Sequence, residues 1–525
     1  MDTVIRGATI VDGTGKKAFL ADVGIVGKKI ARVGKIEEKG AREISANGKL
    51  LIPGFVDPHS HVDAGVFTEC FARNRIVQGI TSDFVGHCGA TPAPFCAERG
   101  DVLQRIYYDL TGLTKRFEWK WTDVDSYIKA IEATKPSSNI ATLVGHGTLR
   151  AYVMGEEPRK ATERELDAMC ELLDACLCQG AMGLGLGLNN MPGLYSDTDE
   201  LIALAKVCKK HDAIVVAHRR SESGTAVEAV EEMIRVTEAT GVRMNIAHVK
   251  VMGRDNWGKA KTILALIDDA AARGLDVTFD VYPYIYSFGQ LGMIFPRWLF
   301  TPGWAKMKET ISDKAFRRKL IDDMQNGRED CFYTDAGGAD GVQVVQCDDP
   351  RYNGKTLREI GEIIGEDPLE CALRLIEKSD YTVMGFFAFQ NEAEMDSIVL
   401  HKNAMILSDG VPSYGHNHPR YMGAFAHYLE HYVKETGALT LEEAVRRVTS
   451  MPARRYRFNG RGVVEEGAFA DLALLDWEKF HDNCTYADPI RKADGVEAVF
   501  LNGTLAAERG RYLGQGVGEV LRRGK

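Results

Sequence analysis

The chain has 525 residues, of which 45% are hydrophobic and 26% charged, with a formal net charge of -9 and a pI near 5.9. This length suits one large α/β barrel with a smaller domain. The net negative charge argues against nucleic acid or an anionic membrane as the main partner. No apolar window reaches the ~18 residues of a spanning helix, and the first residues printed do not show a basic segment followed by an apolar stretch. The eleven irregularly spaced cysteines favour free thiols, so we expect a cytoplasmic protein.

The two ends of the chain share one pattern, in which short β-rich runs alternate with glycine turns. Gly7–Gly13 and Val23–Val33 show it near the N-terminus, and Gly467–Asp476 and Val496–Leu505 repeat it near the C-terminus. Such spacing is typical of hairpins rather than of βα units. We therefore predict that residues 1–53 and 460–525 pair into one small β-sandwich.

The middle of the chain alternates apolar strand-like runs with longer helical patterns, as in parallel βα units. The strand candidates are Leu51–Phe55, Gly79–Val85, Asn139–Val144, Gly180–Leu186, Ile214–Ala217, Arg243–Ala247, Leu275–Val281, Tyr381–Phe386 and Ala404–Leu407. The helix candidates are Glu163–Cys178, Thr198–His211, Gly224–Thr240, Trp257–Arg273 and Leu441–Thr449. About eight such units predict a (β/α)8 barrel over residues 54–459, with chemistry at the carboxyl ends of its strands. Residues 288–350 break the rhythm and predict an inserted lid or subdomain.

Two histidines follow the first predicted barrel strand. The apolar run from Leu51 is punctuated by Pro53 and Gly54 and leads to His59 and His61. Residues two apart in a strand point to the same face, so the two imidazoles form half a metal site. A pair of this kind is also typical of surface or hydrogen-bonding histidines, and the interpretation depends on further donors.

Four more donor side chains stand at the ends of other predicted strands. Cys88 follows Gly79–Val85, and a thiolate is a good zinc ligand. His218 and His248 each end an apolar strand in successive βα units, and Asp409 follows Ala404–Leu407. Each is compatible with core packing when taken alone. Together with the first pair they predict a metal centre with six donors, in which Asp409 can also exchange a proton with water.

Two other histidines, His87 and His146, also stand at strand ends. Because six donors already suffice for two metals, we expect these two to support the ligands or face the substrate.

The chain resembles the amidohydrolase superfamily, and within it the N-acyl-D-amino-acid deacylases, also called D-aminoacylases. The resemblance runs nearly end to end. Its motifs are Pro53–His61, Gly86–Gly89, Val144–Arg150, Pro192–Tyr195, His218 with Arg220, His248–Lys250, Asn256–Gly258, Asp280–Tyr284, Ser408–Gly410 and Arg461–Asp471. Many relatives bridge two metals with a carboxylated lysine, and the comparable strand ends here carry none. The resemblance implies that Cys88 takes that place.

The resemblance also implies roles for the individual residues. Cys88, His218 and His248 would hold one tight zinc, and His59, His61 and Asp409 would form a second, weaker or vacant site. Asp409 would be the catalytic acid and base.

The expected substrate is a small N-acyl amino acid, bound through its carboxylate by Lys250, Tyr282 and Arg220. His146 is a further candidate contact. The alternatives are a solvated Lys250, a Tyr282 packed in the barrel wall, and an Arg220 paired with Glu222.

Departures from the family's usual pattern leave the substrate open. His87 stands where asparagine is common, Arg219–Glu222 reads Arg-Arg-Ser-Glu, and Phe295–Trp298 carries an arginine. The extra cations favour an acidic substrate side chain or are simple surface charge. A related enzyme that opens a cyclic amide or a D-amino-acid dipeptide, and a metal-free scaffold, are the competing hypotheses. The sequence predicts no oligomeric state.

Overall fold

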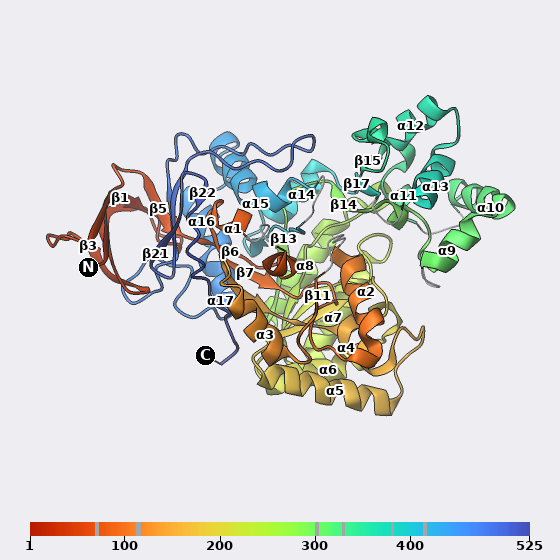
Figure 1. Cartoon of the computed structure of the whole chain (residues 1–525), viewed down its shortest axis with the longest axis horizontal. Helices are drawn as coiled ribbons and strands as arrows, with labels where there is room; N and C mark the ends of the chain where they lie inside the picture. The colour runs from red at the N-terminus through yellow and green to blue at the C-terminus, as the bar shows by residue number, and fades with distance from the viewer. Residues whose placement is uncertain are drawn as a thin grey trace.

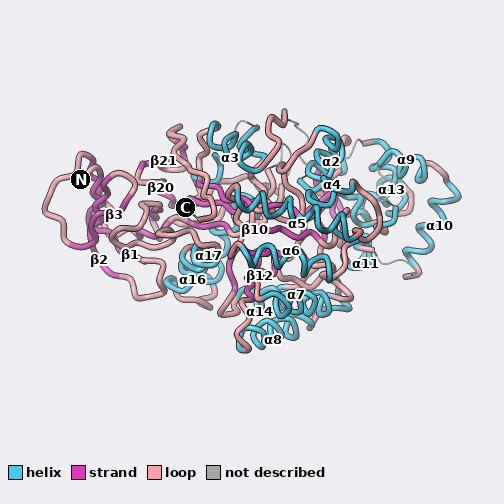
Figure 2. The backbone as a smooth tube through the Cα atoms, turned by 90° about the horizontal axis from the view of Figure 1, so that it is seen from below, coloured by secondary structure: helices cyan, strands magenta, loops and turns pink. Residues whose placement is uncertain are grey.

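The computed structural model describes residues 1–68, 73–111, 117–299, 304–327, 331–379, 383–412 and 417–524. Figure 1 shows three parts side by side: a sheet that contains the N-terminal strands, a central barrel surrounded by helices, and a subdomain at the opposite end. Figure 2 gives the same order of parts from below. In the described part of the chain, no helix is both long enough and apolar enough to cross a membrane.

The barrel strands form two parallel sheets that meet at two seams. The barrel strands are β6 (Phe55–Asp57), β7 (Ile80–Val85), β8 (Asn139–Thr142), β9 (Val144–Gly145), β10 (Gly183–Gly187), β11 (Ile214–His218), β12 (Arg243–Ile246), β13 (Val277–Val281) and β18 (Ala404–Ile406). One sheet has the order β6-β7-β8 and the other β18-β13-β12-β11-β10-β9. Only Leu143 separates β8 from β9, so one chain segment joins the sheets at the first seam. At the second, a single parallel bridge between Ser60 and Gly410 closes the barrel.

Helices cover the outside of the barrel because each presents an apolar stripe to the strands. The larger ones are α2 (Gly100–Thr111), α3 (Val124–Ala133), α4 (His146–Met154), α5 (Glu163–Cys178), α6 (Thr198–Lys210), α7 (Ala226–Thr240), α8 (Lys259–Ala272), α14 (Glu392–Val399), α15 (Arg420–Leu429) and α16 (Leu441–Val448). A short helix, α1 (Arg73–Ile76), precedes β7, and α17 (Ser450–Arg455) follows α16. The bounds of α5 agree with the prediction, because a Thr162–Glu165 capping box starts it.

The two chain ends share one nine-stranded sheet, as predicted. Its strands are β1 (Thr3–Ile10), β2 (Phe19–Val26), β3 (Lys29–Gly34), β4 (Arg42–Ser45), β5 (Leu50–Pro53), β19 (Leu472–Leu475), β20 (Val496–Leu501), β21 (Thr504–Glu508) and β22 (Arg511–Tyr512). Antiparallel pairing of β5 with β19 joins the N-terminal and C-terminal strands. Residues from both ends, among them Ile5, Leu51, Leu474 and Phe500, share a core of their own.

The predicted strand Leu51–Phe55 is two strands, β5 in the end sheet and β6 in the barrel. Gly54 separates them, and a Cβ atom at this position would lie 2.2 Å from the Cγ2 atom of Thr81. The chain therefore turns between the two domains at a residue where a side chain would collide with β7.

The prediction of Tyr381–Phe386 as a barrel strand is wrong. Residues 380–382 lie outside the described residues, and Met384–Phe387 forms β17 of a separate four-stranded sheet. That sheet also contains β14 (Ser287–Gln290), β15 (Val342–Gln346) and β16 (Lys355–Thr356). Apolar composition identifies a strand but not the sheet to which it belongs.

The subdomain around this sheet has its own core and five helices among the described residues. They are α9 (Trp304–Ile311), α10 (Lys314–Gln325), α11 (Phe332–Asp335), α12 (Leu357–Ile364) and α13 (Pro368–Lys378). The predicted domain boundaries stay predictions. From the position of β17 we propose that the insertion extends to about residue 387 rather than 350.

Candidate metal centre

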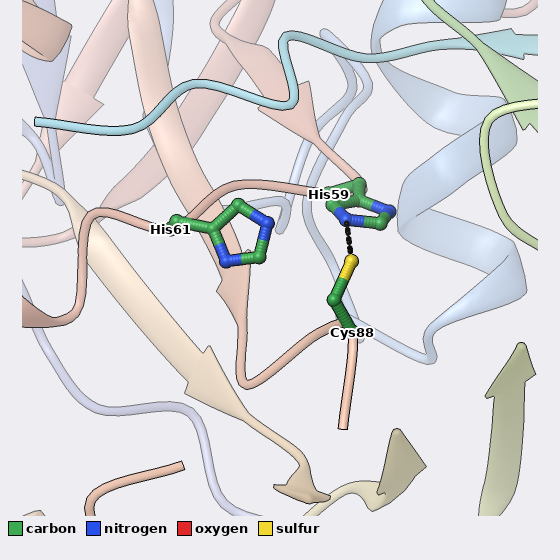
Figure 3. Close-up of side chains that lie close together, drawn as sticks. All are labelled: His59, His61 and Cys88. Atoms are coloured by element: carbon green, nitrogen blue, oxygen red, sulfur yellow. Dashed lines mark hydrogen bonds between the residues drawn. The ribbon is translucent and has the colours of Figure 1, made fainter. Parts of the chain in front are cut away.

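The six predicted donors come together at one end of the barrel, and Figure 3 shows three of them. His59 and His61 follow β6, Cys88 follows β7, His218 is the last residue of β11, His248 follows β12, and Asp409 follows β18. The carboxyl ends of parallel barrel strands all lie at the same rim, so residues far apart in sequence converge there.

Cys88 is the centre of the cluster. Its Sγ atom lies 3.5 Å from Nε2 of His59, 3.4 Å from Nδ1 of His218 and 3.8 Å from Nε2 of His248. Sulfur and nitrogen donors of one tetrahedral zinc ion lie roughly 3.5 Å apart, given bonds of about 2.3 and 2.0 Å. The sulfur–nitrogen spacing of these donors therefore matches that of a zinc site. Two donor groups share the thiol: one with His59 and His61, the other with His218 and His248.

Asp409 adds a carboxylate to the group that contains His59 and His61. Its Oδ1 atom lies 3.2 Å from Nε2 of His61 and 3.5 Å from Nε2 of His59. Its other oxygen, Oδ2, lies 2.9 Å from the Arg420 guanidinium at the start of α15. One carboxylate oxygen thus faces the histidines, and the other is held by an arginine.

Burial controls the protonation of these groups. It lowers the pKa of His59, His218 and His248, so that the rings are neutral and available as ligands. It also raises the pKa of Cys88 well above its ordinary value. A bound metal would therefore have to displace the thiol proton, which leaves to solvent or a base, for Cys88 to act as a thiolate ligand.

Asp409 is ionised in spite of its burial. Burial alone would raise its pKa, but the Arg420 guanidinium and the neighbouring imidazoles hold this pKa well below the ordinary value. The carboxylate is therefore ionised at neutral pH, which is the state that a general base needs.

A buried carboxylate, Glu222, supports the donor group of Cys88, His218 and His248. Its Oε1 atom lies 3.0 Å from Nδ1 of His248, and its Oε2 atom lies 2.8 Å from Nζ of Lys250. Arg219 donates a further hydrogen bond of 3.3 Å to Glu222. A carboxylate behind a ligand histidine fixes the orientation of the ring and directs its other nitrogen towards the metal.

Three of the six donors have strained backbones. The φ angles of Cys88, His248 and Asp409 are 56°, 33° and 45°. L-residues rarely adopt this left-handed region, which costs of order 1 kcal/mol or more for residues other than glycine. The surrounding structure therefore holds the three side chains in positions that the local chain would not adopt by itself.

Two predicted substrate contacts lie close to the centre. Lys250 is buried, and its Nζ lies 5.5 Å from the centroid of the Tyr282 ring. Burial would lower the pKa of Lys250, but the Glu222 carboxylate outweighs it and raises the pKa, so the lysine is charged. The Arg420 guanidinium lies 4.7 Å from the same ring. Two cations and a phenol thus stand together beside Asp409.

The other two predicted contacts have partners elsewhere. Arg220 donates two 3.1 Å hydrogen bonds to Glu232 and one to the carbonyl of Leu194. The alternative pairing of Arg220 with Glu222 is not the one observed. His146 is buried at the start of α4, and its Nε2 lies 2.7 Å from Glu200.

His87 has the supporting position expected for it, because its ring stacks on the His59 ring at a centroid distance of 3.8 Å.

Glu222 and Arg420 were absent from the predicted site. Glu222 lies in the loop after β11, in the Arg219–Glu222 segment. The sequence showed the charges of this segment but predicted no role for Glu222 in the metal centre. Arg420 lies eleven positions after Asp409 at the start of a helix, and no strand-end pattern points to it. The available signal for each was a charged residue close in sequence to a predicted ligand.

A parallel barrel with buried histidine, cysteine and carboxylate donors at the carboxyl ends of its strands defines the class of metal-dependent barrel enzymes. The chain belongs to the amidohydrolase family, whose model matches residues 42–507.

The chain is similar over almost its whole length to deacylases of Alcaligenes xylosoxydans xylosoxydans. It is 33% identical to an N-acyl-D-glutamate deacylase, over 96% of this chain and 93% of the relative. It is 30% identical to a D-aminoacylase, over 99% of this chain and 98% of the relative.

Solved structures give the same result. A D-aminoacylase with a binuclear metal centre has a TM-score of 0.83 and 30% identity, over 99% of this chain and all of that one. An N-acyl-D-glutamate deacylase from Bordetella bronchiseptica has a TM-score of 0.81 and 30% identity, with 99% of each chain covered. That structure contains zinc and a phosphonate inhibitor that mimics the tetrahedral intermediate of the reaction.

Proposed function

We propose that this chain is a zinc-dependent hydrolase that cleaves the amide bond of N-acyl-D-amino acids and releases a carboxylate and a free D-amino acid. The observation that carries the proposal is the position of Cys88, whose sulfur lies 3.4 to 3.8 Å from three histidine nitrogens in a buried site. The full-length similarity to deacylases supports the choice of reaction.

Cys88, His218 and His248 would hold the tighter zinc, and His59, His61 and Asp409 would form a second, weaker site. Zinc would supply Lewis acidity, which lowers the pKa of bound water to about 7 and polarises a carbonyl. The neutral rings and the spacing around Cys88 fit this ion.

Asp409 would take a proton from the attacking water and pass it to the leaving amine, because an amine leaves only when protonated. Its oxygen beside His61 faces the donor groups, and Arg420 keeps the carboxylate ionised between turnovers.

Lys250, Tyr282 and Arg420 would bind the free carboxylate of the substrate. Charge-assisted hydrogen bonds from fixed cations are the strong means of holding such a group. Lys250 and Arg420 also pair with carboxylates, but both lie against the Tyr282 ring beside the donors. Arg220 and His146 pair with Glu232 and Glu200 instead and stay the weaker candidates.

We also propose that the enzyme works in the cytoplasm, since the described cysteines are free and the working thiol has to stay reduced.

Substrate screening tests the proposal. Purified enzyme with measured zinc content is assayed on N-acetyl-D- and N-acetyl-L-forms of glutamate, aspartate and methionine, with hydantoins and D-dipeptides alongside. Turnover of at least one N-acetyl-D-amino acid, well above its L-form, is expected. Turnover of only hydantoins or dipeptides would favour the alternative amidohydrolase activities, and a metal-free inactive protein would favour a scaffold.

A lysine variant tests the binding of the carboxylate. Lys250→Met keeps the length of the side chain and removes its charge, so the KM for N-acyl amino acids should rise about 10- to 100-fold, from the 1.5 to 3 kcal/mol of a charged hydrogen bond. Equal KM values for the variant and the wild type would contradict the assignment.

A further inference from the structure

The seam between β6 and β18 is where the barrel has least backbone pairing. Every other neighbouring pair of barrel strands is joined by a ladder or, at β8 and β9, by the continuous chain. Here the described residues provide one bridge, Ser60 with Gly410, made of two 2.9 Å hydrogen bonds: the N–H of Asp409 donates to the carbonyl of His59, and the N–H of His61 donates to the carbonyl of Gly410. The candidate ligands His59 and His61 lie on one side of this seam and Asp409 on the other. Their spacing therefore depends on what holds the seam together.

A buried carboxylate, Asp57, spans the seam. It is the last residue of β6, and no part of it is exposed. Its Oδ1 atom accepts hydrogen bonds from the backbone N–H of His59 at 3.2 Å and of Ser408 at 3.1 Å. Its Oδ2 atom accepts a hydrogen bond from the Ser408 hydroxyl. The Asp57 side chain thus binds the backbone of His59 on one side of the seam and Ser408, the neighbour of Asp409, on the other.

A buried guanidinium, Arg75, extends this connection to two more segments. It pairs with Asp57, donates from Nε to Oδ1 of Asp83 on β7 at 3.1 Å, and donates from Nη1 to the carbonyl of Tyr421 at 3.1 Å. Tyr421 is the neighbour of Arg420. Arg75 is completely buried, so these bonds are made away from water and are not weakened by it.

We propose that Asp57 and Arg75 are positioning residues that set the distance between the His59–His61 pair and Asp409. The inference rests on the proposed function, since it concerns the same metal centre. Neither residue is among the six donors. Their effect should fall mainly on the weaker donor group, because His218 ends β11 and His248 follows β12, and these two strands are joined by a continuous ladder.

Ser408→Ala tests the proposal with a small change. It removes the hydroxyl that donates to Asp57 and accepts from the N–H of Gly410 at 3.0 Å, and it keeps every charge and every metal donor. Ser138→Ala is the matched control, because Ser138 is equally buried and donates to the other oxygen of Asp83 at 2.8 Å, away from the seam. Zinc and cobalt titrations of metal-depleted protein give the affinities of both sites, and the same titrations in a His218→Ala background identify the constant that belongs to Cys88, His218 and His248 (the Cys88 site).

For Ser408→Ala we expect the dissociation constant of the second site to rise at least tenfold and that of the Cys88 site to change less than threefold. The kcat should fall about tenfold at nearly constant KM. Ser138→Ala should leave both dissociation constants and kcat within twofold of the wild-type values, even if its melting temperature falls as far as that of Ser408→Ala.

Asp57→Asn should reproduce the Ser408→Ala pattern more strongly. Equal losses of stability in the two serine variants, with unchanged affinities and kcat in both, would overturn the inference and leave the proposed function standing. If wild-type protein bound neither metal and hydrolysed none of the amides, the proposed function itself would fail.

Discussion

The two donor groups share Cys88 but differ in the charges around them. His218 and His248 are neutral rings, and the Glu222 carboxylate behind them is paired with Lys250. His59 and His61 face Asp409, whose charge is already balanced by Arg420. The thiolate belongs to both groups, so the difference lies in the carboxylates: Glu222 fixes the His248 ring from behind, whereas Asp409 is itself a donor and is shared with Arg420. A dication should therefore bind more tightly between Cys88, His218 and His248, where the ligand ring is already oriented, and Asp409 remains available for proton transfer.

The largest expected effect comes from the thiol that both groups share. Cys88→Ala should remove zinc from the purified protein and lower kcat/KM roughly thousandfold or more, because neither group keeps a full set of ligands. Metal analysis and steady-state kinetics measure both. Cys208→Ala is the control, since Cys208 is equally buried in α6 and lies outside both groups; its zinc content should equal that of the wild type. A Cys88→Ala enzyme with full zinc and near-normal turnover would contradict the shared site.

Asp409→Asn tests the role of Asp409 in catalysis separately from zinc binding at Cys88, His218 and His248. We expect kcat to fall about 100- to 10,000-fold, the usual contribution of a general acid–base group, while one zinc per chain is retained at Cys88. Metal content and kcat are measured on the same preparation. Loss of the tight zinc would mean that Asp409 is its ligand, and near-normal turnover with zinc present would remove Asp409 from proton transfer.

Glu222→Gln changes the other group. The glutamine keeps the shape of the side chain but loses the charge that orients His248 and holds Lys250, so zinc affinity should fall about 10- to 100-fold. Competition with a chelator gives the affinity. The Ser221→Ala variant, in the same loop, should bind zinc as the wild type does. If Glu222→Gln bound zinc as tightly as the wild type, Glu222 would not stabilise zinc at His218 and His248, and the two groups would not differ in this respect.

The smallest effect on activity is expected at Arg220. Because its guanidinium pairs with Glu232, Arg220→Gln should change KM less than threefold and lower stability by about 1 to 3 kcal/mol through the buried carboxylate left behind. KM and the unfolding midpoint are measured together. A tenfold rise in KM would return Arg220 to the carboxylate-binding site.

The strand-end donors could be predicted from the sequence because parallel barrel strands bring their carboxyl ends to one rim. His59, Cys88 and His248 needed only an apolar run and a donor residue one to four positions after it. Glu222 and Arg420 could not be found in this way, since a loop and a helix start carry them and their positions depend on tertiary packing. β17 was assigned to the wrong sheet for a related reason: its apolar run is the same whether the strand lies in the barrel or in the insertion.

The left-handed backbones at Cys88, His248 and Asp409 have an evolutionary consequence. Glycine adopts these angles without strain, so a glycine substitution at any of the three positions would relieve part of the strain while it removes a donor. Selection for stability alone would therefore move these positions towards glycine, and only selection for the reaction keeps cysteine, histidine and aspartate there. Among related chains, a glycine at one of these positions would mark a barrel that has given up the chemistry and kept the fold.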